Sequence, residues 1–305
     1  MAKPKPTGYP PEGEELPSPV IDNHTHLPLG PVEDFPQGVT PLPIDVQLAR
    51  AARANVVGLI HSSCELPDLQ PGIDLARAHA PVRAAIAIHP NEATRHAHVT
   101  DVGPDGWEPA LAPHHEVSLD DAVAGVGDLA AANRDVVVAI GETGLDWFRT
   151  AGRGHDVQRA AFRAHIALAK ELDLPLQIHD RDAHADVLDV LRRDGAPART
   201  VFHCFSGDRA MAEVLNEHGW YASFAGPITY KSNDELREAC RAMDPALVLV
   251  ETDAPYLTPV PYRGRPNASY LMTHTVRAVA EQLDMELTQA CHQLLANTRG
   301  VYGSW

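Results

Sequence analysis

The chain has 305 residues, 44% of them hydrophobic, which is enough for one large globular domain with a substantial core. Its formal net charge of −16 argues against a broad nucleic-acid-binding face, because most of its surface would repel phosphates. The sequence has no apolar run of the roughly 20 residues needed to span a membrane, no signal-peptide pattern and no CxxC pair, so a cytoplasmic protein with reduced thiols is expected.

The N-terminal residues 1–19 contain six prolines and no periodic apolar pattern, which predicts a disordered arm. The remaining residues, 20–305, show no internal repeat and no shift in composition. They are therefore expected to form a single domain.

Short apolar runs alternate with longer helical patterns after residue 19. Helical spacing is clear in 158–172 and in 182–195, and the second pattern ends on Gly195, as a helix commonly does. Eight alternations predict an α/β fold, specifically a (β/α)8 TIM barrel, with two extra C-terminal helices at 268–284 and 287–298. The predicted strands are 20–24, 56–61, 83–89, 136–142, 176–180, 200–205, 221–226 and 247–253.

One stretch, residues 91–117, departs from this alternation and is predicted to be a long loop after the third strand. Loops of this length are commonly lids, binding elements or disordered segments. Its four histidines (His96, His98, His114 and His115) are expected to be solvated.

Most of the predicted strands end in a side chain that can bind a metal. In a barrel the carboxyl ends of the strands converge on one rim, where enzymes of this fold carry their chemistry. The pattern therefore predicts a metal centre at that rim. Its candidate ligands are His24, His26, Glu142, His179, His203 and Asp253.

His24 and His26 are two residues apart on the first predicted strand, so both imidazoles are expected on the same face. Glu142 follows the fourth strand between Gly141 and Gly144, which are expected to let the chain turn sharply there. Its two oxygens could bridge two cations about 3.5–4 Å apart. A salt bridge to a helix is the alternative for Glu142.

His179 and His203 each interrupt an apolar strand, and neutral imidazole is a good ligand for zinc, manganese and iron. Asp253 is the last of the six candidate ligands. If 247–253 is a strand, Leu249, Glu251 and Asp253 share one face, so Asp253 could bind a cation and accept a proton from a metal-activated water. Glu251 could orient a ligating histidine or form a buried salt bridge.

Several further residues could contact a substrate. His89 precedes a proline and could border the pocket, but both His89 and His61 are as easily ordinary strand-end histidines. Basic side chains on predicted loops after strands could hold phosphates or could be plain surface charge: Arg181, Lys231, Arg263 and Arg265. Nearby aromatic residues could stack a base or pack in the core: Trp147, Phe148, Tyr256 and Tyr262.

Seven motifs in order make the sequence resemble the TatD family of metal-dependent deoxyribonucleases, in the amidohydrolase superfamily, from about residue 20 to 303. The motifs are IDNHTHL, AIHP, AIGETGLDW, LQIHDRDA, FHCFSGD, ETDAPYLTPVPYRGRPN and ANTRGVYG. The resemblance implies a barrel that binds two divalent cations (Zn²⁺, Mn²⁺ or Mg²⁺) through the six ligands named above, with Glu142 as the bridging carboxylate. The chain departs from the family pattern at Asn23, Thr25 and Asn91, positions near the metals that bear on the substrate.

The expected function is a metal-dependent hydrolase that cleaves DNA phosphodiester bonds as an exonuclease. Glu142 and Asp253 are the expected catalytic residues, and Arg181, Lys231, Arg263 and His89 the expected substrate contacts. Because of the negative net charge, the expected partners are DNA ends or short single strands, with neither a membrane nor an obligatory protein partner. The alternatives are a metallohydrolase acting on a small ester, lactone or phosphoester, and a non-catalytic barrel with a structural metal.

Overall fold

The computed structural model describes residues 8–29 and 39–305. Packing divides the chain into two compact units. Unit 1 comprises residues 1–61, 208–300 and 305, and unit 2 comprises residues 62–207 and 301–304.

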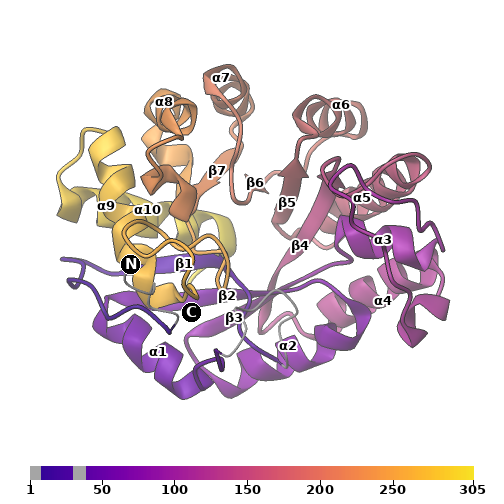
Figure 1. Ribbon diagram of the computed structural model, residues 1–305, viewed down its shortest axis with the longest axis horizontal. Coiled ribbons are helices and arrows are strands. Elements are labelled where there is room, and N and C mark those ends of the chain that lie inside the picture. Colours follow the sequence, from indigo (N-terminus) through magenta and orange to yellow (C-terminus); the bar gives the residue numbers. More distant parts are fainter. Residues whose placement is uncertain (1–7, 30–38) are drawn as a thin grey trace, which may run out of the picture. The chain divides into compact units, whose positions relative to one another are not determined.

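Eight strands follow the chain in the sheet order β1 to β8, and the ladders between neighbours are parallel (Figure 1). Each overlaps one predicted strand, and the main differences lie at the carboxyl ends. The strands are β1 (Val20–Thr25), β2 (Val56–Ser63), β3 (Val82–Ile86), β4 (Val137–Asp146), β5 (Leu176–Arg181), β6 (Thr200–Phe202), β7 (Tyr221–Phe224) and β8 (Val248–Val250).

Helices occupy most of the connections between strands, and two more follow β8. They are α1 (Ile44–Arg53), α2 (Leu66–Ala78), α3 (Pro90–His96), α4 (Leu119–Ala132), α5 (Gly154–Glu171), α6 (His184–Asp194), α7 (Arg209–His218), α8 (Asp234–Ala242), α9 (Met272–Gln282) and α10 (Leu287–Tyr302). Four short 3-10 helices also occur: η1 (Pro113–Glu116), η2 (Gly226–Thr229), η3 (Pro245–Leu247) and η4 (Ser269–Leu271). Within the described ranges, no helix has both the length and the apolar character required to cross a bilayer.

Unit 2 is built on β3 to β6, whose side chains are mostly buried on both faces apart from the last residues of β5, as is usual in a parallel sheet covered by helices. The strand β4 does not end at Glu142 but runs on to Asp146 beside β5 (Figure 1). Gly144 therefore permits close strand approach rather than a turn: its φ is +149°, and a Cβ there would lie 2.0 Å from the carbonyl oxygen of His179. The predicted turn was wrong, because β4 and β5 stay paired.

Unit 1 contains β1, most of β2, β7 and β8. The chain leaving β8 returns to β1 through two backbone hydrogen bonds, from Asp253 N to His24 O (3.0 Å) and from His26 N to Ala254 O (2.7 Å). These bonds place Asp253 directly beside the two histidines of β1.

The described part of the N-terminal arm, residues 8–19, contacts segments that are distant in the sequence. Arg265 donates from Nε to the carbonyl oxygen of Gly8 (2.7 Å), and the Tyr270 hydroxyl donates to that of Pro10 (2.6 Å). Glu12 pairs with Arg53 at 2.7 Å. Residues 1–7 lie outside the described part of the chain.

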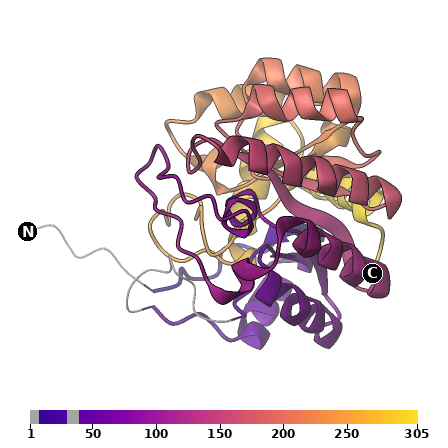
Figure 2. The same ribbon diagram turned by 90° about the vertical axis from the view of Figure 1, so that its right-hand side faces the viewer.

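The predicted loop 91–117 is partly helical, because α3 and η1 lie within it, and Figure 2 shows the irregular backbone between them in the purple range of the colour scale. Three of its histidines are not solvated as predicted. His96 and His115 are buried, and His114 is 21% exposed. His115 donates from Nε2 to Glu92 (2.8 Å) because its Nδ1 accepts from the amide of Ala112.

His165, on α5, provides a stability prediction that does not involve the functional site. It is fully buried, its Nε2 accepts from the backbone amide of Ile88 (3.2 Å), and its Nδ1 donates to the carbonyl oxygen of Ala161 (2.8 Å). Burial lowers the pKa of His165 to about 4. Because the unfolded chain has a histidine pKa near 6.5, it binds the proton first, so stability falls as the pH drops from about 6.5 towards 4.

We expect His165→Gln to reduce the loss of unfolding free energy between pH 7 and pH 4.5 by roughly 2–3 kcal/mol relative to the wild type. Urea denaturation at several pH values measures this difference. The exposed His218 on α7 supplies the control, since His218→Gln should keep the wild-type pH dependence. An unchanged slope in His165→Gln would contradict the assignment.

Candidate metal centre

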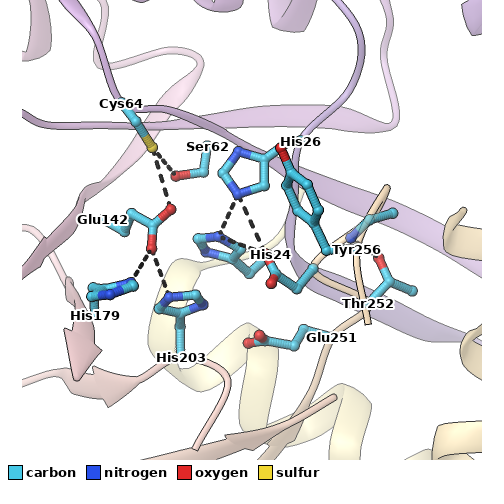
Figure 3. A network of polar contacts seen from close by, with 12 residues as sticks. His24, His26, Ser62, Cys64, Glu142, His179, His203, Glu251, Thr252 and Tyr256 are labelled. Atoms are coloured by element: carbon cyan, nitrogen blue, oxygen red, sulfur yellow. Dashed lines mark hydrogen bonds and ion pairs between the residues drawn. The ribbon is translucent and has the colours of Figure 1, made fainter. Parts of the chain in front are cut away.

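Three side chains of unit 1 converge where β1 and β8 end, and we call them the β1/β8 group. The Nε2 atoms of His24 and His26 lie 3.3 Å apart (Figure 3). The Oδ1 atom of Asp253 lies 3.3 Å from His26 Nε2 and 3.7 Å from His24 Nε2. His24 is fully buried, whereas the Asp253 side chain is 14% exposed.

Asp253 reaches this position by a different route from the one predicted. The strand β8 ends at Val250, and Asp253 has a φ of +51°, so side-chain alternation along a strand does not extend to it. Its place is fixed by the hydrogen bond from its amide to His24 O. The sequence therefore identified a residue that meets the histidines, but the reason given for it was wrong.

A buried carboxylate, Asp22, holds the segment after β8 against β1. Its Oδ1 accepts from the Thr252 amide (2.9 Å) and its Oδ2 from the Thr252 hydroxyl (2.6 Å). Burial raises the pKa of Asp22 to about 7. Asp22 therefore fixes the backbone at Thr252, the residue before the candidate ligand Asp253.

Glu251, predicted to orient a histidine or to form a buried salt bridge, is completely buried, and its Oε2 accepts from the Ser223 hydroxyl at 2.5 Å. Ser223 Oγ in turn accepts from Asn23 Nδ2 (2.7 Å), which also donates to Val250 O (2.7 Å). Asn23, one of the departures from the family pattern, thus ties β1 to β7 and β8.

Three side chains of unit 2 form a second cluster, which we call the β4–β6 group. Oε2 of Glu142 lies 2.7 Å from Nε2 of His203 and 3.1 Å from Nδ1 of His179 (Figure 3). Glu142 and His203 are both buried. Glu142 thus lies against the imidazoles of two histidines near the ends of β5 and β6.

The electrostatics of this group are dominated by burial and by close charge pairing. Burial opposes ionisation of Glu142, but the neighbouring imidazoles of His203 and His179 outweigh it and hold the pKa of Glu142 well below its usual value. Burial likewise opposes protonation of His179, but hydrogen bonds to Asp146 and Glu142 raise the pKa of His179 to about 9. A metal needs the deprotonated ring nitrogen, so a cation here competes with a proton.

His89 lies beside the same group. Its ring centroid is 4.6 Å from that of His179, its Nε2 is 3.9 Å from Glu142 Oε2, and its Nδ1 accepts from the amide of Asn91. Burial lowers the pKa of His89 to about 4, so it is neutral near pH 7. By contrast, His61 uses its Nδ1 to accept from the amide of Leu27 (3.1 Å), which indicates a structural role.

Two residues that the sequence analysis did not select also touch this group. Asp146, which is 1% exposed, places its Oδ2 3.2 Å from His179 Nε2. Cys64 lies with its Sγ 3.4 Å from Glu142 Oε1 (Figure 3). Extending the fourth predicted strand by four residues would have revealed Asp146, because residues 142 and 146 then share a face.

Both groups fit divalent cations by their donor chemistry. The ring nitrogens of His24 and His26 face each other and the Asp253 carboxylate, an arrangement in which a cation would satisfy the converging lone pairs. In unit 2, Oε2 of Glu142 lies 2.7 Å from Nε2 of His203 and 3.1 Å from Nδ1 of His179, so the ligand atoms of the β4–β6 group also converge. Imidazole and carboxylate ligands together suit zinc, manganese and iron.

The predicted phosphate contacts occupy varied environments. Arg181 is exposed, with its guanidinium 3.8 Å from the ring centre of Phe148, and Arg263 is likewise exposed, 4.0 Å from that of Tyr230. Lys231 is also exposed. Arg265, however, is committed to carbonyl groups of the N-terminal arm, so it is a structural residue.

Across residues 21–303 the chain matches a family described as "TatD related DNase". A metal-dependent hydrolase TatD of Mycobacterium tuberculosis, described as uncharacterised, is 37% identical over 288 residues, covering 93% of this chain and 98% of the relative. The metal-dependent hydrolase YabD of Bacillus subtilis, also described as uncharacterised, is 34% identical over 65% of this chain and 75% of its own length.

Solved structures show the same fold. YjjV, a TatD homologue from Escherichia coli, aligns with a TM-score of 0.77 and 25% identity over 94% of this chain and 98% of its own. A TatD-family hydrolase from Entamoeba histolytica aligns with a TM-score of 0.76 and 19% identity over 95% of this chain and 100% of its own. With the strand order, this similarity confirms the predicted (β/α)8 TIM-barrel fold.

Proposed function

Given that this chain belongs to the TatD-related DNase family and is a metal-dependent hydrolase, we propose that it hydrolyses phosphodiester bonds at DNA ends or in short single strands. The family match also confirms the resemblance seen in the sequence motifs.

The observation that carries the proposal is the pair of convergent donor groups. His24 and His26 meet Asp253 in unit 1, and His179 and His203 meet Glu142 in unit 2. The two histidines of β1, His179, His203 and Asp253 lie near or just after the carboxyl ends of strands in one parallel sheet, and Glu142 lies in the second half of β4; this is the edge at which enzymes of this fold carry their chemistry. A structural metal would need only one such group.

We further propose that the chain holds two divalent cations, with Glu142 as one of the ligands. The β1/β8 group would hold one cation, and His179 and His203 the other. Bound divalent cations lower the pKa of water towards 7 and stabilise negative charge on phosphoryl oxygens.

Asp253 is the proposed proton acceptor. Its side chain is partly exposed, unlike Glu142, so water and substrate can reach its carboxylate. It would take the proton of the attacking water. As the new P–O bond forms in line, the bond to the sugar oxygen of the leaving strand breaks, and that oxygen leaves with a proton from a water molecule. Neutral His89, beside Glu142, is the proposed contact for the phosphate near the scissile bond.

The test is an assay of chelator-treated protein reloaded with Zn²⁺, Mn²⁺ or Mg²⁺. Labelled single-stranded and double-stranded DNA and a panel of esters and lactones would serve as substrates. Release of nucleotides from DNA ends that depends on metal supports the proposal. Activity on small molecules alone, across all three metals, overturns it.

A small-molecule metallohydrolase is the second candidate. The net charge of −16 favours it, because a strongly acidic surface repels a polyanion. The same donor groups would serve an ester, lactone or phosphoester.

If DNA is the substrate, the exposed Arg181 and Arg263 should contact its phosphates, assisted by Lys231. We expect the double variant Arg181→Ala/Arg263→Ala to raise KM about tenfold with little change in kcat. It should also flatten the salt dependence of log(kcat/KM) by about 0.7 for each lost phosphate contact, as for single strands. Steady-state assays across a range of salt concentrations measure both effects.

The matched control is Arg193→Ala, because the Arg193 side chain is 75% exposed and pairs with Asp189 on α6. It should leave KM and the salt slope unchanged. A double variant that behaves like this control would show that Arg181 and Arg263 are ordinary surface charges.

A further inference from the structure

His179 is held from both sides by carboxylates. Its Nδ1 faces Glu142 Oε2 at 3.1 Å, and its Nε2 faces Asp146 Oδ2 at 3.2 Å. A neutral imidazole carries one proton, so only one of its nitrogens can present a lone pair to a cation. Whatever fixes the proton on Nε2 therefore decides whether Nδ1 is available.

The Asp146 carboxylate is fixed independently of His179. Its Oδ1 accepts from the backbone amide of Arg149 (2.8 Å), and its Oδ2 accepts from the side-chain amide of Asn91 (3.1 Å). Asp146 and Asn91 are 1% and 8% exposed. Both oxygens thus have donors, and the Oδ2 atom facing His179 can only accept.

The orientation of the Asn91 amide is itself imposed by a backbone group. The amide N–H of Asp146 donates to Gln158 Oε1 (2.8 Å), so Gln158 must turn its NH₂ the other way, towards Thr150 Oγ1 (2.6 Å) and Asn91 Oδ1 (3.3 Å). Thr150 Oγ1 also donates to Asn91 Oδ1 (3.2 Å). Asn91 Oδ1 is therefore an acceptor, which leaves its NH₂ for Asp146.

We propose that Asp146 is a positioning residue that keeps His179 in the Nε2–H tautomer, and that Asn91 locks Asp146 in place. The inference rests on the proposed role of His179 as a metal ligand. With one proton held on Nε2 by Asp146, the proton on Nδ1, which faces Glu142, is the one that a cation would replace. Without Asp146, the proton can move to Nδ1 and the ring can rotate.

The first test measures the affinity for Zn²⁺ by competition with a chelating dye. Asp146→Ala should weaken the binding of one Zn²⁺ about 10- to 100-fold, the range for partners that orient metal-binding histidines. Asn91→Leu should weaken it by a smaller factor, because it removes only the donor that holds Asp146. Zn²⁺ affinities equal to the wild type in both variants would overturn the proposal.

Asp180→Ala is the matched control. Asp180 is the next residue after His179 on β5, its side chain is 5% exposed, and its Oδ2 pairs with His184 Nδ1 at 2.8 Å. It is therefore also a buried aspartate with a histidine partner, but it does not touch His179 or Glu142 in these contacts. If Asp180→Ala weakened the binding of Zn²⁺ as much as Asp146→Ala does, a general loss of negative charge would explain the effect. That result would overturn the proposal.

A second readout reports the tautomer directly. Imidazole ¹⁵N–¹H spectra of the zinc-loaded protein should show His179 with a proton on Nε2, and this signal should be lost in Asp146→Ala. A proton on Nδ1 in the wild type would refute the proposal. If Asp146→Ala does not fold, Asp146→Asn and Asn91→Leu, which keep the side-chain size, decide the question by the same two measurements.

These results separate the inference from the proposed function. Zn²⁺ binding that depends on Asp146 in a protein without nuclease activity would support the positioning role and overturn DNA as substrate. Metal-dependent DNA cleavage by a protein whose Zn²⁺ affinity does not depend on Asp146 or Asn91 would support DNA as the substrate and overturn the positioning role.

Discussion

Replacing Glu142 with glutamine should remove tight binding of at least one cation and lower hydrolysis about 1,000-fold. The buried carboxylate faces His203 at 2.7 Å and His179 at 3.1 Å, and Cys64 contacts its other oxygen. Glutamine has the same shape but no negative charge, and its NH₂ cannot bind a cation. A cation contributes several kcal/mol of charge stabilisation to such a reaction, and about 4 kcal/mol corresponds to that loss of rate.

The measurements are metal content by elemental analysis and turnover of the reloaded protein. Circular dichroism and the thermal midpoint establish that Glu142→Gln is folded. Glu171→Gln, at the exposed end of α5, is the matched control and should keep both metal and activity. A Glu142→Gln protein with the full metal content and wild-type turnover would remove Glu142 from the centre.

Asp253→Asn should lower kcat by about 100- to 10,000-fold, the range associated with loss of a general base. Asparagine keeps the size of the side chain beside His24 and His26 but cannot accept a proton from water. The fold should persist, because Asp253 is fixed through its backbone amide and its side chain is partly exposed. The effect should appear in kcat more than in KM, since the proposed phosphate contacts are other residues, Arg181 and Arg263.

The assay compares single-turnover rates at matched metal occupancy, so that loss of metal is not mistaken for loss of the proton acceptor. Asp244→Asn is the control, because Asp244 is an exposed aspartate that caps the η3 turn just before β8. Wild-type turnover in metal-reloaded Asp253→Asn would show that another group takes the proton.

Local pattern was a good guide to secondary structure and to the type of residue at strand ends. His24 and His26 could be assigned to one face because β1 does run through Thr25, so alternation holds up to the pair. The same reasoning failed for Asp253, because β8 stops at Val250 and a turn follows. Alternation is reliable only while the backbone remains extended.

Composition was a poorer guide where distant segments supply partners. The arm has six prolines and no periodic apolar pattern, so nothing local indicates its contacts with Arg265 and Tyr270, more than 250 positions away in the sequence. Similarly, His96 and His115 lie in a polar stretch, but they are buried around Glu92 and the end of η1.

The sequence by itself determined the eight strand–helix alternations and the histidines and carboxylates at strand ends, because both follow from periodicity over a few neighbouring residues. Only the tertiary structure decided which partner each histidine nitrogen has. Nε2 of His179 faces Asp146, and Nδ1 of His61 accepts from the amide of Leu27. The reason is physical. A hydrogen bond depends on the positions and angles of two groups, and these are set by the packing of segments that are far apart in the chain.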